Sequence, residues 1–415
     1  MHTHTLDNGL LVVSERMEAR SVAIGLWVGT GACHEVDGES GMSHFIEHML
    51  FKGTQKRCAK DIAAEMDGVG GQLNAFTGKE CTCFHAKVMD AHLPIAGDLL
   101  ADMLLHSRFD PGEIRKEQGV VVEEIAMVQD SPEDLVHDMA AELYYGDGPM
   151  GNNILGSRES VMAFEAEGLR AYMGKQYVPG NAVLSLAGNV SDGQAVELAE
   201  QCFGEWAAAE RPSAQGLNAV RGKEKVRCCA RDAEQVHLCL VMPGVSLKEE
   251  AQYPMLVLNN LLGGSMSSRL FQQVREERGL AYSIYSYPSA AVESGAFSVY
   301  AGCSPAQAEQ VTKLVLEELA EIRQNGVTEE EFVRGREQLR GSFILGREGV
   351  ASRMNVMGKG MLQLGRVQTE EEVLAKIDAV TPEDVVQLAR RIFDPAGIRG
   401  AYAGATKGLR PENWL

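Results

Sequence analysis

The sequence VAIGLWVGTG at residues 22–31 decides the fold, because a second run of the same kind, VHLCLVMPGV, stands at residues 236–245. A continuous apolar run bounded by glycine is typical of a buried β-strand. An acidic turn, a helix and Gly-rich residues follow each run, and alternating strands then lie within 73–88 and 281–301. The chain is therefore predicted to contain one structural unit twice.

The order of the later segments supports this duplication. An amphipathic helix is expected at residues 93–104 in the first half and at 311–319 in the second. Further along, FDPGEIRKEQ at 109–118 resembles VTEEEFVRGREQ at 327–338. Matching order over some 200 residues predicts two homologous copies, even where few residues are identical.

The domain boundaries follow from the weakest pattern in the chain. Residues 207–225 are polar and contain Pro, Gly and Ser, which predicts a linker. We expect an N-terminal domain at 1–206 and a homologous C-terminal domain at 226–415. Strands come in hairpin-like runs and helices in separate blocks, so each domain is predicted to be α+β, with a mostly antiparallel sheet packed with helices.

Composition narrows the partners and the compartment. The 415 residues include 39 Lys and Arg against 58 Asp and Glu, a formal net charge of -19. Such a protein repels phosphate groups, so we expect no nucleic acid and no membrane as partner, and basic ligands are favoured. The nine cysteines lack zinc-ribbon spacing, and no signal peptide or long apolar run is evident. These features predict reduced thiols in a cytoplasmic protein.

The strongest chemical signal is the pentapeptide His44-Phe-Ile-Glu47-His48. On a helix, positions i and i+4 share a face, so the two imidazoles can hold one metal ion. Glu47 lies on the same side, where its carboxylate can take a proton from an attacking water. This H-x-x-E-H order is the inverted zincin motif, and a catalytic zinc of that kind has a third protein ligand. The alternative is a helix that carries two ordinary surface histidines.

The third ligand is expected on the helix predicted at residues 113–128. Glu117 and Glu124 lie two turns apart on one face of that helix, and Glu123 is adjacent to the latter. All three residues are also compatible with a solvated helix face, which is the usual environment of glutamate. Spacing alone does not choose among them.

Three separated segments resemble the pitrilysin/insulinase metallopeptidases, in particular the mitochondrial processing peptidase type and its short bacterial relatives. The segments are GMSHFIEHMLFKGT at 41–54, GGQLNAFTGKE at 70–80 and KEQGVVVEEI at 116–125. The resemblance implies a processing peptidase-like metallohydrolase fold and one Zn²⁺ per chain. It also implies that Glu124 is the third ligand and that Glu117 orients a ligand or assists catalysis.

The second half lacks the metal motif, since residues 255–271 read MLVLNNLLGGSMSSRLF. Arg275 and Tyr282 nevertheless match an Arg/Tyr pair that the family's C-terminal half contributes to the active site, where both can donate hydrogen bonds to a developing oxyanion. A surface ion pair for Arg275 and a buried strand position for Tyr282 are the alternatives. Short family members imply a homodimer in which both residues act on the partner chain's metal centre.

The resemblance also implies where a peptide substrate binds. An extended peptide is expected to pair with an edge strand at Asn74, Ala75, Phe76 and Thr77, with Phe51 lining a pocket. Asp134 and Asp138 match acidic residues that hold a substrate arginine, and their i,i+4 spacing allows both to meet one guanidinium. Core packing of Phe51 and a solvated helix start at the two aspartates are the alternatives.

These inferences together predict a zinc-dependent endopeptidase that cleaves short or unfolded peptides. The rival hypothesis is a noncatalytic structural or partner subunit of a processing peptidase-like complex. Such relatives typically lose motif residues, whereas His44, Glu47, His48 and Glu124 are all present here. A third possibility is a catalytic chain that needs a separately encoded partner.

Overall fold

The computed structural model describes residues 1–213, 217 and 222–415, which form two compact units. The first unit comprises Met1–Ile125, Asn152–Gln215 and Gly346–Gln368, and the second comprises Ala126–Gly151, Gly216–Leu345 and Thr369–Leu415. Contacts thus assign residues 126–151 to the second unit and 346–368 to the first, across the expected boundaries at 206 and 226.

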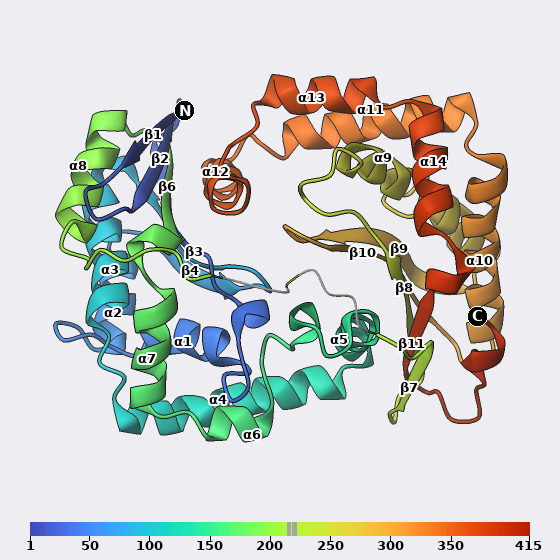
Figure 1. Ribbon diagram of the computed structural model, residues 1–415, viewed down its shortest axis with the longest axis horizontal. Helices are drawn as coiled ribbons and strands as arrows, with labels where there is room; N and C mark the ends of the chain where they lie inside the picture. The colour runs from blue at the N-terminus through green and yellow to red at the C-terminus, as the bar shows by residue number, and fades with distance from the viewer. Residues whose placement is uncertain (214–216, 218–221) are drawn as a thin grey trace. The chain divides into compact units, whose positions relative to one another are not determined.

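A six-stranded sheet forms the centre of the first unit, in the order β1-β2-β6-β3-β5-β4 (Figure 1). Its strands are β1 (His2–Thr5), β2 (Leu11–Arg16), β3 (Ser21–Val28), β4 (Gln72–Thr77), β5 (Thr82–Met89) and β6 (Ala182–Gly188). Only β2 and β6 pair in parallel among these strands; the other neighbours are antiparallel. Residues 22–28 of the apolar run at 22–31 lie in β3, a buried strand in the interior of the sheet.

The second unit repeats this arrangement with five strands in the order β7-β11-β8-β10-β9. They are β7 (Val226–Ala230), β8 (Val236–Pro243), β9 (Ala281–Ala290), β10 (Gly295–Cys303) and β11 (Arg399–Gly404). Strand for strand, this is the order β2-β6-β3-β5-β4 of the first sheet, again with one parallel pair in the described chain, β11 with β7. The shared topology confirms the predicted α+β fold with two similar halves.

Helices flank both sheets. Those of the first half are α1 (Met42–Leu50), α2 (Ala59–Gly68), α3 (Leu93–His106), α4 (Pro111–Asp130), α5 (Pro132–Tyr145), α6 (Arg158–Met162), α7 (Ala166–Gln176) and α8 (Asp192–Phe203). Those of the second half are α9 (Gln252–Leu262), α10 (Ala308–Asn325), α11 (Glu329–Leu345), α12 (Val350–Leu364), α13 (Glu370–Ala379) and α14 (Pro382–Ile392). A π-helical turn spans Phe271–Glu276. No helix in the described ranges is both long and apolar enough to cross a membrane.

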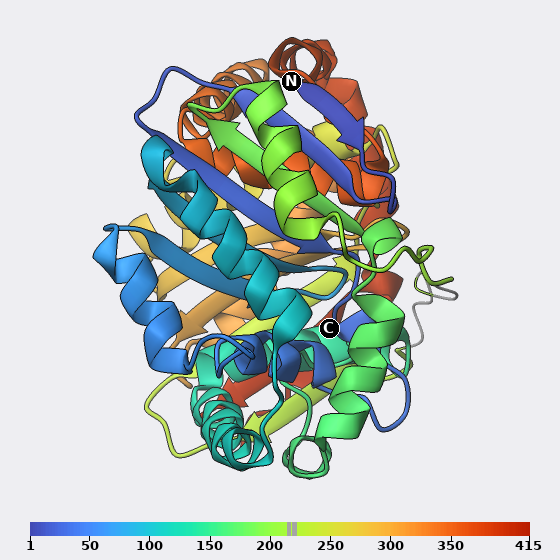
Figure 2. The same cartoon turned by 90° about the vertical axis from the view of Figure 1, so that its left-hand side faces the viewer.

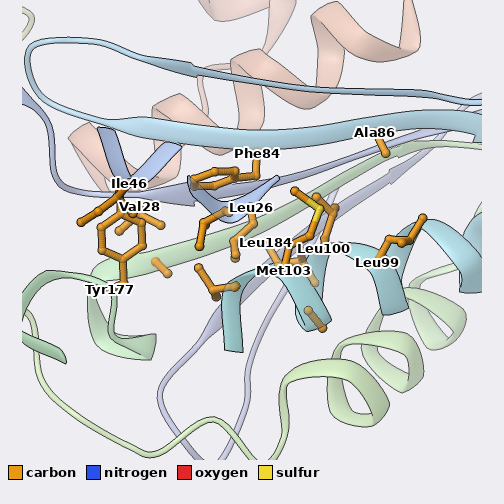
Figure 3. Packing of buried hydrophobic residues seen from close by; sticks show 14 of the residues in the cluster. Leu26, Val28, Ile46, Phe84, Ala86, Leu99, Leu100, Met103, Tyr177 and Leu184 are labelled. Carbon is orange, nitrogen blue, oxygen red and sulfur yellow. The ribbon is translucent and has the colours of Figure 1, made fainter. Parts of the chain in front are cut away.

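The main core of the first unit lies between its sheet and the helices α1, α3 and α8 (Figure 2). Strand β3 contributes Leu26 and Val28 to this layer, and Leu100 and Met103 of α3 face them (Figure 3). Ile46 of α1 is also fully buried there. The helix with the metal motif is therefore anchored by its apolar face, which leaves the opposite face for polar side chains.

Neither half of the sequence supplies both helix layers of its own unit. Helix α12, from the second half, packs on the remaining face of the first sheet against β3 and β6. Helix α5, from the first half, packs in the same way against β8 and β11. The amphipathic pattern of a helix reports that one face is apolar but does not report which sheet it covers, so this exchange was not predicted.

A glycine on α12 allows this helix to lie close to the sheet. A Cβ atom on Gly358 would approach the indole of Trp27 to 2.2 Å, and Trp27 is only 2% exposed. We expect Gly358→Ala to lower the free energy of unfolding by about 1–2 kcal/mol, because overpacking of a dense core outweighs the gain in helix propensity.

Urea unfolding of the two single variants checks this prediction, with Gly174→Ala on α7 as the matched control. No atom lies within 4 Å of the corresponding Cβ position at Gly174, so alanine there should stabilise the unit by up to about 1 kcal/mol. Equal effects of the two substitutions would contradict the close approach of α12.

Candidate metal centre

The helix that carries the metal motif has an unusual N-terminus. Gly41 precedes α1 with φ of 85°, and a Cβ atom there would lie 2.5 Å from the carbonyl oxygen of Leu155, so glycine is required. The buried Glu35 carboxylate accepts hydrogen bonds from the backbone N–H groups of Gly41 and Ser43, both at 2.8 Å. These bonds satisfy free N–H groups of the first helical turn. Burial raises the pKa of Glu35 to about 7.

His44, His48 and Glu124 bring their ligand atoms together. One potential ligand atom from each side chain lies within 4.8 Å of the others. The Oε2 atom of Glu124 is 3.8 Å from Nε2 of His44 and 3.5 Å from Nε2 of His48. Two imidazole nitrogens and a carboxylate oxygen form a donor set that suits Zn²⁺ and leaves a coordination position open. The residues present therefore fit a catalytic zinc ion.

Glu117 contacts His48 at Nδ1, the ring nitrogen that does not face Glu124. Its Oε1 atom lies 2.7 Å from Nδ1 of His48, and its Oε2 atom lies 2.7 Å from Nζ of Lys52. The Nδ1–H group of the neutral ring donates to Glu117, so the lone pair of Nε2, on the side of Glu124, is available to a metal ion. The two glutamates on α4 thus have different surroundings, since Glu117 orients a ring and Glu124 faces both Nε2 atoms.

The protonation states of the metal-free centre differ from residue to residue. Burial, together with the neighbouring His48, lowers the pKa of His44 to about 4, so this ring is neutral near pH 7. Burial alone would also lower the pKa of His48, but the hydrogen bond that its ring donates to Glu117 and three carboxylate charges raise it. Burial raises the pKa of Glu47. Since a metal binds the neutral imidazole, a metal ion and a proton compete for His48.

We expect Glu117→Gln to weaken zinc binding by about 10–100-fold, because the amide cannot hold the His48 ring as a carboxylate does. A competitive chelator titration measures this change in affinity. Glu113→Gln, on the same helix and in an ion pair with Lys116, is the control and should leave the affinity unchanged. An unaltered affinity in Glu117→Gln would contradict the orienting role.

Glu47 points toward the strand at the edge of the sheet. Its Oε2 atom accepts a hydrogen bond of 2.5 Å from Oγ1 of Thr77, the last residue of β4. Strand β4 has only β5 as neighbour in the sheet, so its other side is free of strand partners within the described part of the chain. The metal-motif helix and an open strand edge are therefore directly connected.

The residues predicted to bind substrate along β4 alternate in exposure. Asn74 and Phe76 are exposed, whereas Ala75 and Thr77 are half-buried and face the helices. Phe51 ends α1, is half-buried and packs against the main core, so it takes part in the core packing that was the alternative. The predicted strand 73–77 is present and lies at an edge, while its role in substrate binding stays a prediction.

Four further predicted residues belong to the second unit. Arg275 lies over two aromatic rings, those of Phe271 and Tyr282, with 4.7 Å from its guanidinium carbon to each centroid. Tyr282, the second residue of the edge strand β9, is 78% exposed, which excludes the buried alternative. Nε of Arg275 lies 3.6 Å from Oε1 of Glu276, so the ion pair that was the alternative for Arg275 is present. Asp134 is exposed in the first turn of α5, and Asp138 follows one turn later, half-buried. Their catalytic and substrate-binding roles stay predictions.

Two contributors to the metal centre were missed in the sequence. Glu35 lies outside the motif, and no spacing rule connects it with the helix that it caps. Lys52 stands four residues after His48, so helical periodicity places it on the same side. Its ion pair with Glu117 could have been anticipated from that spacing.

The fold and the His-His-Glu group are typical of a metal-dependent hydrolase. The family model described as Insulinase (Peptidase family M16) matches residues 11–158, and the model described as Peptidase M16 inactive domain matches residues 163–339. The chain belongs to the pitrilysin/insulinase family of peptidases, M16, which confirms the resemblance seen in the sequence.

Similar proteins agree with this family. The chain is 44% identical to the "Uncharacterized zinc protease YmxG" of Bacillus subtilis, a match that covers 94% of this chain and 95% of that protein. It is 42% identical to a similarly named protein of Streptomyces coelicolor, with 94% and 86% covered. Two solved structures share the fold at 21% identity: a peptidase M16 inactive domain from Pseudomonas fluorescens, TM-score 0.90 with 99% of both chains covered, and a Helicobacter pylori protease, TM-score 0.88 with 97% and 98% covered.

Proposed function

We propose that this protein is a zinc-dependent endopeptidase that hydrolyses short or unfolded peptides. The observation that carries the proposal is the convergence of His44 and His48 of α1 with Glu124 of α4, beside Glu47. Helix α1 also contacts the open strand edge of β4. The names of the relatives, zinc proteases, support the same activity. The alternative of a noncatalytic subunit receives no support from these four residues.

His44, His48 and Glu124 would hold one zinc ion per chain. When bound, zinc supplies Lewis-acid polarisation of the peptide carbonyl and makes the attacking water more acidic. Glu47 takes a proton from that water at its carboxylate and delivers it to the nitrogen of the leaving amine. Glu117 keeps the His48 ring in the orientation that presents Nε2.

The peptide is proposed to bind as an added strand along β4. Unpaired backbone groups at this edge can donate to and accept from an extended chain of almost any sequence. Only a segment that can become fully extended can pair in this way, so folded domains are excluded as substrates. Asn74 and Phe76, exposed on the face of β4 opposite Ala75 and Thr77, would contact alternate side chains of the peptide.

The proposal also includes a preference for basic peptides and a homodimer of the chain. The net charge of -19 and the i,i+4 pair Asp134 and Asp138 support a preference for arginine-containing substrates. Arg275 and Tyr282 are proposed to act across a homodimer, where both can stabilise an oxyanion. The processing peptidase type and the cytoplasmic location remain inferences from the sequence.

Mass spectrometry of peptide digests tests the proposal. The purified chain should cleave an unstructured arginine-containing peptide, and cleavage should stop with a chelator and return with zinc. The same sequence inside a folded domain should resist. If peptides with arginine replaced by glutamine are cleaved at the same rate as the arginine peptides, only the proposed preference for basic substrates is refuted. If no unstructured peptide is cleaved, the proposal that the chain is a peptidase is contradicted.

A further inference from the structure

We propose that Thr77 is a positioning residue for Glu47. Its hydroxyl fixes the carboxylate of the general base relative to β4, the strand that binds the peptide. This inference rests on the proposed function, and it assigns to the Thr77 side chain a role separate from strand pairing. It is carried by the 2.5 Å hydrogen bond from Oγ1 of Thr77 to Oε2 of Glu47.

The backbone of Thr77 is held firmly at the end of β4. Thr77 pairs with Thr82 of β5, and the turn between them is closed by a 2.8 Å bond from the Gly78 N–H to the carbonyl of Cys81. Thr82 is fully buried, and its hydroxyl donates to the carbonyl of Thr30 at 2.9 Å. The hydroxyl of Thr77 therefore projects from an end of the hairpin that these hydrogen bonds hold in place.

Threonine is well suited to this task. Its branched Cβ restricts χ1, so the hydroxyl is oriented with little further loss of side-chain entropy. A glutamate side chain has three rotatable bonds. A fixed donor to one carboxylate oxygen therefore also fixes the direction of the other oxygen, Oε1 of Glu47. The bond thus selects one carboxylate position among several.

The consequence concerns the chemical step and not peptide binding. If the peptide pairs with β4, the scissile bond is located by the backbone of the strand whose last side chain locates Glu47. The same strand then positions both the general base and the scissile peptide bond. Such fixed relative positions are what efficient proton transfer requires. Removal of the hydroxyl should leave backbone pairing intact while the carboxylate becomes free to rotate.

Steady-state kinetics of Thr77→Val and Thr77→Ser test this role. Valine keeps the shape and the backbone bonds without the donor, so we expect kcat to fall about 10–100-fold with KM unchanged. Serine restores the donor and should recover most of kcat. Thr5→Val, on β1 at the opposite edge of the same sheet, is the matched control and should retain native kinetics.

Two measurements separate positioning from a structural effect. Zinc content and unfolding midpoint should match those of the native chain, and in a Glu47→Gln background Thr77→Val should leave the peptide Kd, measured by fluorescence anisotropy, unaltered. A raised KM or Kd, lost zinc, or an unchanged kcat in Thr77→Val overturns the inference while the native chain still cleaves. Failure of the native chain to cleave overturns the proposed function, and the inference falls with it.

Discussion

Glu47→Gln is expected to lower kcat for peptide cleavage by about 10²–10⁴-fold, the range attributed to a well-placed general base. Glutamine has nearly the same shape as glutamate and can still accept the hydrogen bond from Thr77, but it cannot take a proton from water. The variant should therefore bind zinc and peptide as the native chain does. Peptide mass spectrometry and zinc analysis on the same samples give both quantities.

The zinc content decides how a loss of cleavage in Glu47→Gln is interpreted. Loss of activity with native zinc content assigns the defect to proton transfer. Loss of both would mean that Glu47 supports the metal site, and native cleavage rates in this variant would exclude it as the base.

Glu124→Gln is the second substitution with a large expected effect. Removal of a charged ligand should cost more than removal of an outer partner, so we expect zinc affinity to fall by more than about 100-fold. Peptide cleavage should disappear at zinc concentrations that saturate the native chain. Zinc titration against a chromophoric chelator, followed by the cleavage assay, measures both effects.

The neighbouring residue provides the control for this substitution. Glu123 is exposed on the same helix, one position before Glu124, and the Glu123→Gln variant changes the net charge equally. It should bind zinc and cleave peptide like the native chain. Equal losses in both variants would point to the general negative potential of α4 instead of direct coordination by Glu124.

Several strands were predictable because they carry their own hydrophobic pattern, whereas the exposed strand β1 (His2–Thr5) carries none. The buried runs beginning at Val22 and Val236 form interior strands of the two sheets, as their continuous apolar sequence requires. The exchange of α5 and α12 was not predictable, since it depends on long-range packing. Val350, Met354 and Met357 mark an apolar face of α12, but their spacing fits either sheet equally well.

The metal centre was likewise predictable from the sequence only in part. The i,i+4 histidines of α1 follow from helical geometry alone. The roles of Glu117 and Glu124 depend on how α4 lies against α1, which no spacing within α4 specifies. The structure places Glu117 at Nδ1 of His48 and Glu124 at the Nε2 atoms, while Glu123 is exposed. The resemblance to known peptidases had singled out the same glutamate for the metal, on grounds that local physics could not supply.

The most direct test is a zinc titration of the metal-free native chain, with cleavage of an unstructured peptide measured at each step. We predict that cleavage rises in proportion to bound zinc and reaches its plateau at one ion per chain. Cleavage that persists in the metal-free protein, or its absence with one zinc bound per chain, would contradict a zinc peptidase built on His44, Glu47, His48 and Glu124.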